Sequence, residues 1–280
     1  MKKVKGATSA GSLPLPPKPF AESGPETMRR WFEMKYLDDL SGIRPEQYGY
    51  YQHHVHHFVD SFFTARKIGN SKILDFGCGP GFYSFLLAER GAHVVGLDRD
   101  EFLIGKARET QAKRKSENVE FVLGDIASCS ARWPYGEFDY ILAIDVVVSF
   151  DYMRRRHAHR EVVEAFQAVR RLLADEGRFY IVESHPFFGR VLSEYETESG
   201  ERHCLRPADY RFEHRPPDYP NHWFTLDEMS KASCEARLAI SRIYEPEPSA
   251  ALAREHPGTF EFRVRYPGMI VYELCKMMGV

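Results

Sequence analysis

Hydrophobic positions in the middle of the chain alternate between short apolar runs and longer stretches with helical spacing. The apolar runs, each about five to eight residues long, indicate strands, which we expect at 72–76, 93–98, 119–124, 138–145, 178–183, 238–244 and 269–276. Stretches with apolar residues three or four positions apart indicate helices, which we expect at 82–90, 101–116, 160–174 and 226–234. Strands that alternate with helices are joined by right-handed crossovers, so the pattern predicts an α/β fold with a parallel sheet and helices on both faces.

Other segments do not follow this alternation. Residues 1–25 are rich in Pro, Gly and Ser, which predicts a flexible leader. Aromatic and aliphatic residues recur at helical spacing over 27–40 and 45–68, which predicts two helices ahead of the first strand. Residues 187–224 have no clean period and predict an insertion, and 245–267 are interpreted as a second irregular segment.

The strongest chemical signal is a glycine-rich stretch, Ile73-Leu-Asp-Phe-Gly-Cys-Gly-Pro-Gly81, where a strand ends and a helix begins. Glycines there permit a tight turn and let a ligand approach the backbone, at the edge where open α/β sheets bind ligands. A Walker loop is excluded because no lysine follows. A dinucleotide fingerprint fits poorly, since the third glycine comes one residue early and Asp75 would lie beside a pyrophosphate. An acid before GxGxG suits a ligand with ribose, adenine and a cationic amino-acid tail.

This stretch resembles motif I of the class I S-adenosylmethionine-dependent methyltransferases. Four later segments are similar to the same family, in the same order, at 94–98, 123–126, 138–145 and 171–178. The last of them departs from the family's usual turn, because Asp175-Glu176 replaces Pro-Gly. The resemblance implies an enzyme that uses S-adenosylmethionine as its cofactor and releases S-adenosylhomocysteine.

The same resemblance assigns cofactor contacts to individual residues. It implies that Asp98 accepts hydrogen bonds from both ribose hydroxyls, that Asp125 accepts from the adenine amino group, and that the backbone amide of Ile126 meets the ring. The strand at 138–145 would run under the transferable methyl. The complete set of expected cofactor residues is Asp75, Gly77, Gly79, Gly81, Asp98, Arg99, Asp125, Ile126 and Asp145.

The resemblance also implies an architecture. We expect seven strands with the last one antiparallel, an N-terminal helical lid at 26–69, and a cofactor-binding domain over 70–280 that carries a substrate cap at about 187–224. The lid would close over the cofactor and the cap would cover the acceptor. Lid and cap residues expected near the cofactor or acceptor are Tyr48, Tyr51, Phe187 and Trp223.

The acceptor is predicted to be a small molecule. Family members that act on exocyclic amines of nucleic acid commonly carry an Asn/Asp-Pro-Pro-aromatic tetrad after the fourth strand, whereas this chain has Asp145-Val-Val-Val-Ser-Phe150. The formal net charge of −2 gives no basic surplus for holding a polyphosphate. Aromatic residues make up 14% of the chain and gather in the expected lid and cap, which favours a hydrophobic or aromatic metabolite, with secondary metabolism as the expected setting.

Histidines supply the candidate catalytic base. His185 follows the fifth strand, whose carboxyl end faces the site, and histidine titrates near neutral pH. His157 is the second candidate and His159 the third, both near the start of the long helix. Four further histidines at 53, 54, 56 and 57 suggest a metal, but no HExxH pattern or spaced third ligand accompanies them, so no metal is expected.

The remaining composition bears on compartment and partners. Five scattered cysteines without a CxxC pair favour a reducing, cytoplasmic setting over a disulfide framework. No apolar stretch approaches the length of a membrane span. We therefore expect a small-molecule substrate, neither nucleic acid nor membrane as a partner, and leave a homo-oligomer open.

Three rival interpretations stay open at this point. One is a cyclase or rearrangement enzyme of the same fold that acts on a polyketide or terpenoid, with or without methyl transfer; a product without a transferred methyl and a surviving cofactor would favour it. A nicotinamide-dependent oxidoreductase is disfavoured by Asp75 and the glycine spacing. A non-catalytic module would bind the cofactor without a closed acceptor pocket.

Overall fold

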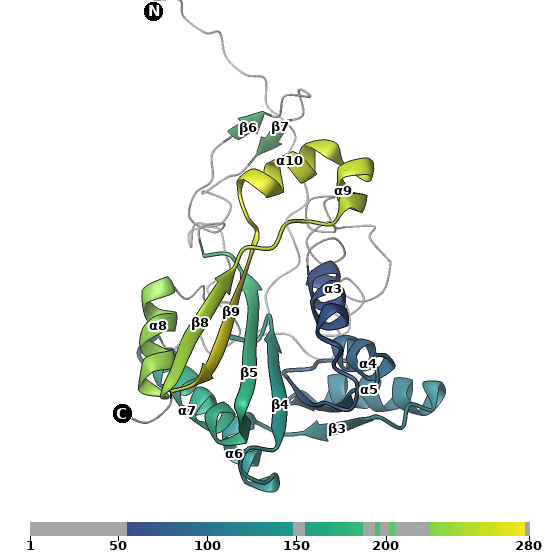
Figure 1. The fold of residues 1–280 in the computed structure, drawn as a ribbon, viewed down its shortest axis with the longest axis vertical. Coiled ribbons are helices and arrows are strands. Elements are labelled where there is room, and N and C mark those ends of the chain that lie inside the picture. The colour runs from purple at the N-terminus through teal and green to yellow at the C-terminus, as the bar shows by residue number, and fades with distance from the viewer. Residues whose placement is uncertain (1–54, 148–154, 187–193, 197–201, 205–224, 278–280) are drawn as a thin grey trace, which may run out of the picture.

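The computed structural model describes residues 55–147, 155–186, 194–196, 202–204 and 225–277. Within these residues, seven strands form one sheet in the order β3-β2-β1-β4-β5-β9-β8 (Figure 1). Their bounds are β1 Lys72–Phe76, β2 His93–Asp98, β3 Val119–Leu123, β4 Phe138–Ile144, β5 Leu173–Ser184, β8 Leu238–Tyr244 and β9 Met269–Lys276. The predicted seven-stranded α/β fold is confirmed.

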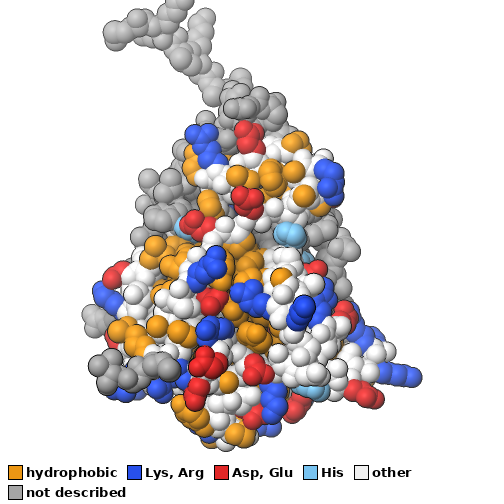
Figure 2. Space-filling view, in the orientation of Figure 1, with side chains coloured by type: hydrophobic (Ala, Val, Ile, Leu, Met, Phe, Trp, Pro, Cys, Tyr) orange, Lys and Arg blue, Asp and Glu red, His pale blue; other side chains and the backbone are white. Residues whose placement is uncertain are grey.

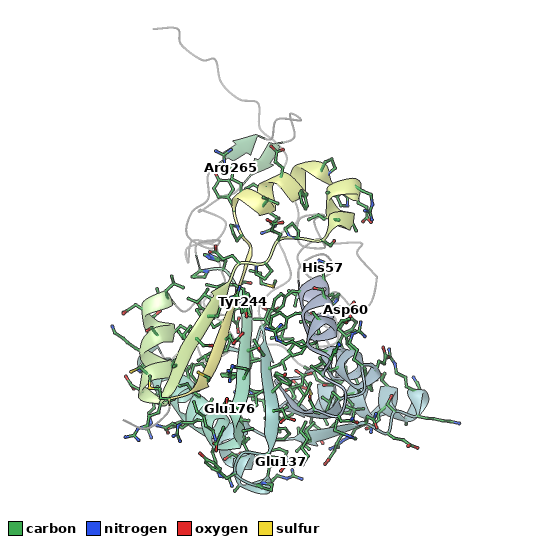
Figure 3. The ribbon with its side chains drawn as sticks, in the orientation of Figure 1. His57, Asp60, Glu137, Glu176, Tyr244 and Arg265 are labelled. Carbon is green, nitrogen blue, oxygen red and sulfur yellow. The ribbon has the colours of Figure 1, made fainter. Side chains whose placement is uncertain are left out.

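The strand directions define one functional edge. The pairs among β3, β2, β1, β4 and β5 are parallel, whereas β9 runs antiparallel to both β5 and β8. The expected antiparallel last strand is therefore present. The carboxyl ends of the other six strands lie along one side, which we call the carboxyl edge. In Figure 3, Glu137 and Glu176 mark the opposite edge, and Tyr244 marks the carboxyl end of β8.

Helices cover both faces of the sheet. The main ones are α3 His57–Arg66, α4 Phe82–Glu89, α5 Glu101–Arg114, α7 Arg155–Leu172 and α8 Leu226–Glu235. Two begin at strong caps: the Asp100 side chain accepts a hydrogen bond from the Leu103 N–H, and Thr225 forms a capping box with Glu228. The core residues of α7 and α8 pack on one face, called the first face, and those of α3, α4 and α5 pack on the second face.

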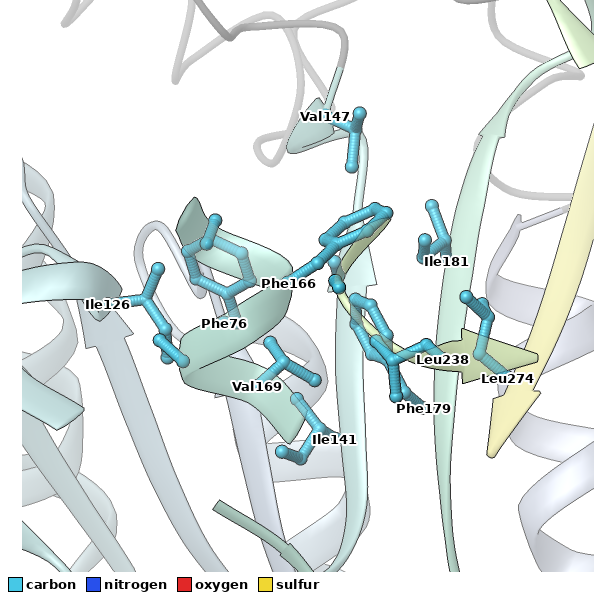
Figure 4. Packing of buried hydrophobic residues seen from close by; sticks show 14 of the residues in the cluster. Phe76, Ile126, Ile141, Val147, Phe166, Val169, Phe179, Ile181, Leu238 and Leu274 are labelled. Atoms are coloured by element: carbon cyan, nitrogen blue, oxygen red, sulfur yellow. The ribbon is translucent and has the colours of Figure 1, made fainter. Parts of the chain in front are cut away.

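The first-face core forms because apolar residues of α7 recur at helical spacing. Phe166 and Val169 point from α7 toward Ile141 of β4 and Phe179 of β5 (Figure 4). The Phe166 and Phe179 rings meet edge to face with centroids 5.5 Å apart. Alternate residues of β5 serve the other face, where Tyr180 packs against Phe63 of α3 at 5.7 Å between ring centroids. Both faces of β5 are thus buried, as a central strand requires.

A bulge at Ser241 turns the end of β8. The pairing register with β9 shifts between Ile240 and Arg242. Ile240 packs with the first-face core, whereas Tyr244 packs with the second. Residues four apart in a regular strand share a face, so the extra residue turns Tyr244 toward α3. There its hydroxyl donates a hydrogen bond of 2.6 Å to Glu273.

The predicted bounds around β5 were wrong. The helix expected at 160–174 begins at Arg155 and ends at Leu172, and β5 begins at Leu173 instead of 178. The first turn of the helix is a run of Arg and His with Ala158 as its one apolar residue, so spacing gave no signal there. The strand starts early because Leu173 already pairs with Phe138 before an irregularity in the register.

The prediction of an irregular segment at 245–267 was also wrong. Two short helices, α9 Ala250–Glu255 and α10 Pro257–Arg265, connect β8 to β9. Because β9 runs opposite to β8, this connection lies at the carboxyl edge (Figure 1). The sequence signals were an N-cap at Ser249 and a proline in the first turn of α10. Both helices are too short for a clear apolar period.

Shorter elements complete the described residues. A helical turn, α6 Ile126–Cys129, and a 3₁₀ turn, Ser130–Arg132, follow β3. Within the expected cap, β6 Glu194–Glu196 and β7 Arg202–Cys204 form a separate two-stranded antiparallel sheet. The expected leader lies outside the described residues, as do most of the expected lid and the rest of the cap.

Candidate cofactor and catalytic site

The loop between β1 and α4 has a conformation that favours glycine. Gly77, Gly79 and Gly81 have φ angles of 75°, 54° and 85°, all in the left-handed region. At Gly81 a Cβ atom would also lie 2.5 Å from Cζ of Phe121, well inside contact distance. Glycine is therefore required for both backbone conformation and space at this turn.

Backbone hydrogen bonds fix this loop to β2. The N–H groups of Gly77 and Cys78 both donate to the carbonyl oxygen of Leu97, at 2.7 and 3.1 Å. The N–H of Gly79 donates to Oδ2 of Asp98 at 2.8 Å. The structure thus brings together the glycine loop and the acid at the end of β2, as the sequence predicted.

Asp98 is held rigidly at the carboxyl edge. Its second oxygen, Oδ1, accepts a hydrogen bond of 2.9 Å from the Asp100 N–H. Burial raises the pKa of the Asp98 carboxyl above its ordinary value, against the opposing effect of the two backbone N–H donors and of Arg99. Arg99 itself is exposed. Each carboxylate oxygen can accept more than one hydrogen bond, so Asp98 keeps capacity for ligand hydroxyls.

Asp75 lies beneath the loop and is only 2% exposed. Its Oδ2 accepts a hydrogen bond of 2.6 Å from the hydroxyl of Ser84, a fully buried residue of α4. Burial raises the pKa of Asp75 to about 6; the Ser84 bond lowers this pKa and the charge of Asp98 raises it. Sequence reasoning found the acid but missed Ser84, because a serine inside a helix carries no distinctive signal.

The end of β3 lies beside Asp98. The Gly124 N–H donates to the Asp98 carbonyl oxygen at 2.8 Å. The next residue, Asp125, is exposed and caps α6 by accepting a hydrogen bond of 2.9 Å from Ala127 N–H. The Ile126 side chain is buried in the first-face core (Figure 4). Ile126 as a whole is 1% exposed, and its expected contact with the adenine ring stays a prediction.

The end of β4 packs against the glycine loop. Asp145 has a φ of 54° and is half-buried. A Cβ on Gly77 would collide with the side chain of Val146, so these two segments are in close contact. The Val147 N–H donates to Oε1 of buried Glu183 at 2.7 Å, which ties this segment to β5. Glu183 was not among the expected site residues.

His185 follows β5 at the same edge and is 3% exposed. Its Nε2 lies 2.9 Å from Oε1 of Glu245, the residue after β8, and its backbone N–H donates to the carbonyl oxygen of Gly268. Sequence reasoning missed Glu245, which is 60 residues away in the chain.

The other histidines lie elsewhere. Nε2 of exposed His159 pairs with Glu235 of α8 at 3.0 Å. His157 falls in the first turn of α7, but its side chain is not described. His56, just before α3, stacks on Phe82 with ring centroids 4.2 Å apart, and a 2.9 Å hydrogen bond joins it to the Tyr83 hydroxyl. The N-terminal segment is thereby held against the first turn of α4.

Four expected lid and cap residues lie outside the described residues, namely Tyr48, Tyr51, Phe187 and Trp223. Among the side chains that are described, no three of His, Cys, Asp and Glu gather in a way that could hold a metal ion. Within the same part of the chain, none of the helices combines the length and the apolar character needed to cross a bilayer.

Comparison with known proteins places the chain in a family. A family model described as a methyltransferase domain matches residues 68–211, just over half of the chain. The chain belongs to this methyltransferase family. The resemblance found in the sequence, the class I fold and the S-adenosylmethionine cofactor that defines such enzymes are thereby confirmed.

Individual relatives of this methyltransferase match over shorter segments. An arsenite methyltransferase of Halobacterium salinarum is 36% identical over 102 residues, which cover 32% of this chain and 26% of that protein. A magnesium-protoporphyrin O-methyltransferase of Rhodobacter capsulatus is 34% identical over 79 residues, covering 28% and 34% of the two chains. The matched segment thus spans 26% and 34% of these relatives' own lengths.

A solved structure extends the likeness to the whole fold. An S-adenosylmethionine-dependent methyltransferase from Mesorhizobium loti superposes with a TM-score of 0.57 at 19% identity, over 77% of this chain and 97% of that one. At this identity the likeness shows the fold alone.

The donor set of this methyltransferase fits its cofactor. S-Adenosylmethionine carries ribose hydroxyls and a cationic sulfonium, and the glycine loop offers close backbone approach beside the Asp98 carboxylate. Asp75 and Asp98 place negative charge close together under that loop, and the charge of Asp98 raises the pKa of Asp75. A nearby positive charge would relieve this repulsion.

Proposed function

We propose that this protein transfers the methyl group of S-adenosylmethionine to a small hydrophobic or aromatic acceptor. The observation that carries the proposal is the 2.8 Å hydrogen bond from the Gly79 N–H to the Asp98 carboxylate. This bond holds a carboxylate that can accept hydrogen bonds from ribose hydroxyls next to the glycine loop. Asp98, the main chain of Gly79 and the segment 124–126 would hold the nucleoside. Asp145, at the end of β4, would lie toward the reacting carbon.

The protein's own residues mainly align the reactants. When bound, S-adenosylmethionine supplies an activated methyl on a sulfonium, which leaves without needing a proton. A protein that fixes the nucleophile in line with that methyl gains most of its rate from orientation. The backbone hydrogen bonds that join the loop to β2, and Val147 to Glu183, give the rigidity that such alignment needs.

A hydroxyl or protonated amine acceptor also needs a base, and we propose His185. Its ring is buried at the carboxyl edge, and Glu245 orients it through a 2.9 Å bond to Nε2. The imidazole of His185 would receive the acceptor's proton while the Glu245 carboxylate stabilises the imidazolium. His185 is preferred over His159 because His159 is exposed and bonded to Glu235 on α8.

Two observations support a small acceptor over nucleic acid. The net charge is −2, and Figure 2 shows basic and acidic side chains mixed on the face in view. The names of relatives do not decide the acceptor class, because two are named for arsenite and magnesium-protoporphyrin and another, 34% identical over 73 residues, is named a 23S rRNA uracil-C5-methyltransferase. The proposed class of acceptor therefore rests more on the aromatic residues in the sequence of the expected cap than on the names of relatives. A cytoplasmic setting is proposed from the scattered cysteines alone.

Calorimetric titration with S-adenosylmethionine tests the cofactor assignment. Asp98→Ala should weaken binding by about 2 to 3 kcal/mol, or some 30-fold to 150-fold, because charged hydrogen bonds to two hydroxyls are lost. Glu120→Gln is the matched control, since Glu120 is an exposed carboxylate on neighbouring β3, and it should bind as the wild type does. Equal affinity in Asp98→Ala and the wild type would refute the assignment.

The acceptor class can be identified by incubating the protein and S-adenosylmethionine with phenols, amines or carbon nucleophiles, and measuring which of them leads to release of S-adenosylhomocysteine. With an acceptor found, His185→Gln should lower kcat by about 10²-fold to 10⁴-fold for a hydroxyl acceptor and leave cofactor affinity unchanged. Glu245→Gln should cause a smaller loss and move the acid limb of the pH–rate profile. An unchanged kcat in His185→Gln would show that His185 is not the catalytic base.

A further inference from the structure

A buried arginine lies next to the strand end that carries the proposed base. Arg263, in α10, is 5% exposed, and His185 is 3% exposed. A Cβ atom on Gly268 would collide with the Arg263 guanidinium and would lie 3.2 Å from its Cζ. The carbonyl oxygen of the same Gly268 accepts a hydrogen bond of 2.9 Å from the His185 N–H. One glycine therefore contacts both the guanidinium and the backbone of the base.

The strand register directs both side chains to the same face of the sheet. β5 and β9 pair antiparallel, and the hydrogen bond between His185 and Gly268 continues their register. Four residues away on each strand, Ile181 and Tyr272 lie opposite each other in the first-face core. Side chains alternate between the two faces along a strand, so His185 and the side-chain position of Gly268 also point to the first face. The Arg263 guanidinium fills that position.

The glycine at 268 is explained by space and not by backbone conformation. Its φ lies outside the left-handed region, so other residues could adopt the same backbone. Any of them would push the Arg263 guanidinium out of its place. A buried guanidinium costs free energy unless opposite charge and hydrogen bonds compensate it. The sequence thus makes room for a buried cation where an apolar side chain would cost less.

Arginine is suited to bind a carboxylate at this place. Its guanidinium offers five N–H donors in a planar fork, and two parallel N–H groups match the two oxygens of one carboxylate. The other donors stay available for contacts within the protein. A phosphate fits the same fork but brings a second negative charge.

The acids nearby favour the carboxylate over the phosphate. Glu183, two residues before His185 on β5, is 4% exposed, and Glu245 lies 2.9 Å from Nε2 of His185. These two carboxylates repel any anion that binds at this edge, and they repel a dianion more strongly than a monoanion.

We propose that Arg263 binds a carboxylate of the acceptor, so that the acceptor is a hydroxylated aromatic acid whose hydroxyl group faces His185. This inference rests on the proposed function, because His185 marks the acceptor site only as the base of methyl transfer. Two parallel hydrogen bonds to the carboxylate also fix the direction of the ring, and in-line transfer depends on that orientation.

Calorimetric titration of the full chain, saturated with S-adenosylhomocysteine, tests this inference without turnover. The probes are para-hydroxybenzoate, para-hydroxyphenylacetate and para-hydroxycinnamate, each compared with its methyl ester, which keeps the ring and the hydroxyl but has no charge. The wild type should bind at least one acid about 10-fold to 150-fold more tightly than its ester, because charged hydrogen bonds are lost in the ester. para-Hydroxyphenyl phosphate should bind more weakly than that acid.

Substitution of Arg263 should change the ratio of acid affinity to ester affinity. Arg263→Met should reduce the ratio to about one, whereas a purely structural role of Arg263 would weaken acid and ester alike and preserve the ratio. Arg263→Lys keeps the charge but loses the fork, so it should retain part of the preference. Arg265→Met is the matched control, since Arg265 is an exposed arginine of the same helix (Figure 3), and it should retain the full preference.

Steady-state kinetics separates the anchor from the base once an acid is methylated. Arg263→Met should raise the KM for the acid by about 10-fold or more and change kcat less. His185→Gln should lower kcat and leave the preference for acid over ester in the binding titration.

The outcomes distinguish the inference from the function on which it rests. A wild type that binds none of the acids, that binds acids and esters equally, or that prefers the phosphate would overturn the inference, as would a preference that survives Arg263→Met. A wild type that does not bind S-adenosylmethionine would overturn the proposed function. If Arg263→Met does not fold, Gly268→Ala decides, because its methyl group displaces the guanidinium: the preference should fall by about tenfold, and an unchanged preference overturns the inference.

Discussion

Two halves of the sheet handle charge in opposite ways, and we name them for the roles proposed above. The donor half comprises β1 to β4 with the glycine loop, and its acids Asp75 and Asp98 lie close together in a buried setting. The acceptor half comprises β5, β8 and β9 with α9 and α10. There Glu273 accepts a bond from the Tyr244 hydroxyl and lies 3.8 Å from Arg66 and 3.4 Å from Arg178. One half concentrates negative charge and the other balances it.

This difference separates function from stability. Unbalanced buried acids destabilise a fold and are retained where a ligand brings the missing charge. Paired charges and packed rings, such as Phe62 against Tyr180 at 5.0 Å between centroids, hold an element in place without a ligand. The donor half should therefore gain most from ligand binding, and the acceptor half should keep its structure unaided.

The largest effect is expected at the glycine loop of the donor half. Gly81→Ala combines a left-handed φ of 85° with a Cβ 2.5 Å from the Phe121 ring. Strain and overpacking together should lower the free energy of unfolding by about 2 to 5 kcal/mol. Chemical denaturation measures this loss, and donor titration should show at least tenfold weaker binding.

Gly105→Ala is the control for that substitution. Gly105 lies within α5, and a Cβ there would have nothing within 4 Å. Alanine should raise the free energy of unfolding by about 0.5 to 1 kcal/mol through helix propensity. Equal losses in both variants would mean that the loop geometry has no special role.

An intermediate effect is expected at Asp75, and its sign is opposite. Its pKa is about 6 in the folded protein against an ordinary value of 3.8, so the folded state binds more protons between these values. The free energy of unfolding should fall as pH rises from about 4 to 6. Asp75→Asn should remove that fall and stabilise the ligand-free protein by roughly 2 to 3 kcal/mol at pH 8.

Thermal unfolding of the wild type and Asp75→Asn at pH 4.5 and pH 8 measures this effect. The gain should be small at pH 4.5, because most of the wild-type carboxyl is already protonated there. A variant that is less stable than the wild type at pH 8 would show that the donor half does not store uncompensated charge.

The smallest effect is expected in the acceptor half. Glu273→Gln keeps a side chain of the same shape but weakens the contacts to Arg66, Arg178 and Tyr244. The free energy of unfolding should fall by about 1 to 2 kcal/mol, and donor affinity should stay within twofold. A large loss of donor affinity would show instead that the two halves are energetically coupled.

The donor half was predictable because its signals are local in sequence. Glycines at 77, 79 and 81, followed by an acid at the end of the next strand, specify a turn and its neighbour within about 25 residues. Parallel strands then place Asp98 beside the loop, and the Gly79 bond confirms that neighbourhood. Whether each predicted residue contacts the cofactor stays a prediction.

The acceptor half was less predictable because its contacts join distant residues. His185 was found from its place after a strand. Glu245 is 60 residues further along the chain, and it lies beside His185 only because β9 pairs antiparallel with β5. The bulge at Ser241, which turns Tyr244 to the second face, leaves no mark in the hydrophobic pattern. In the donor half Ser84 was missed although Asp75 is near it in sequence, because a serine inside a helix carries no distinctive signal.

The place of β9 has a consequence for synthesis of the protein. Among the described residues it is the last strand along the sequence, yet it lies between β5 and β8. Until residues 269–276 leave the ribosome, β5 has an unpaired edge next to the buried side chains of Phe179 and Ile181, and β8 has no neighbour in the sheet. Exposed edges of apolar strands promote aggregation. Translation that stalls before Met269 should therefore produce chains that depend on chaperones, even though their cofactor loop is already complete.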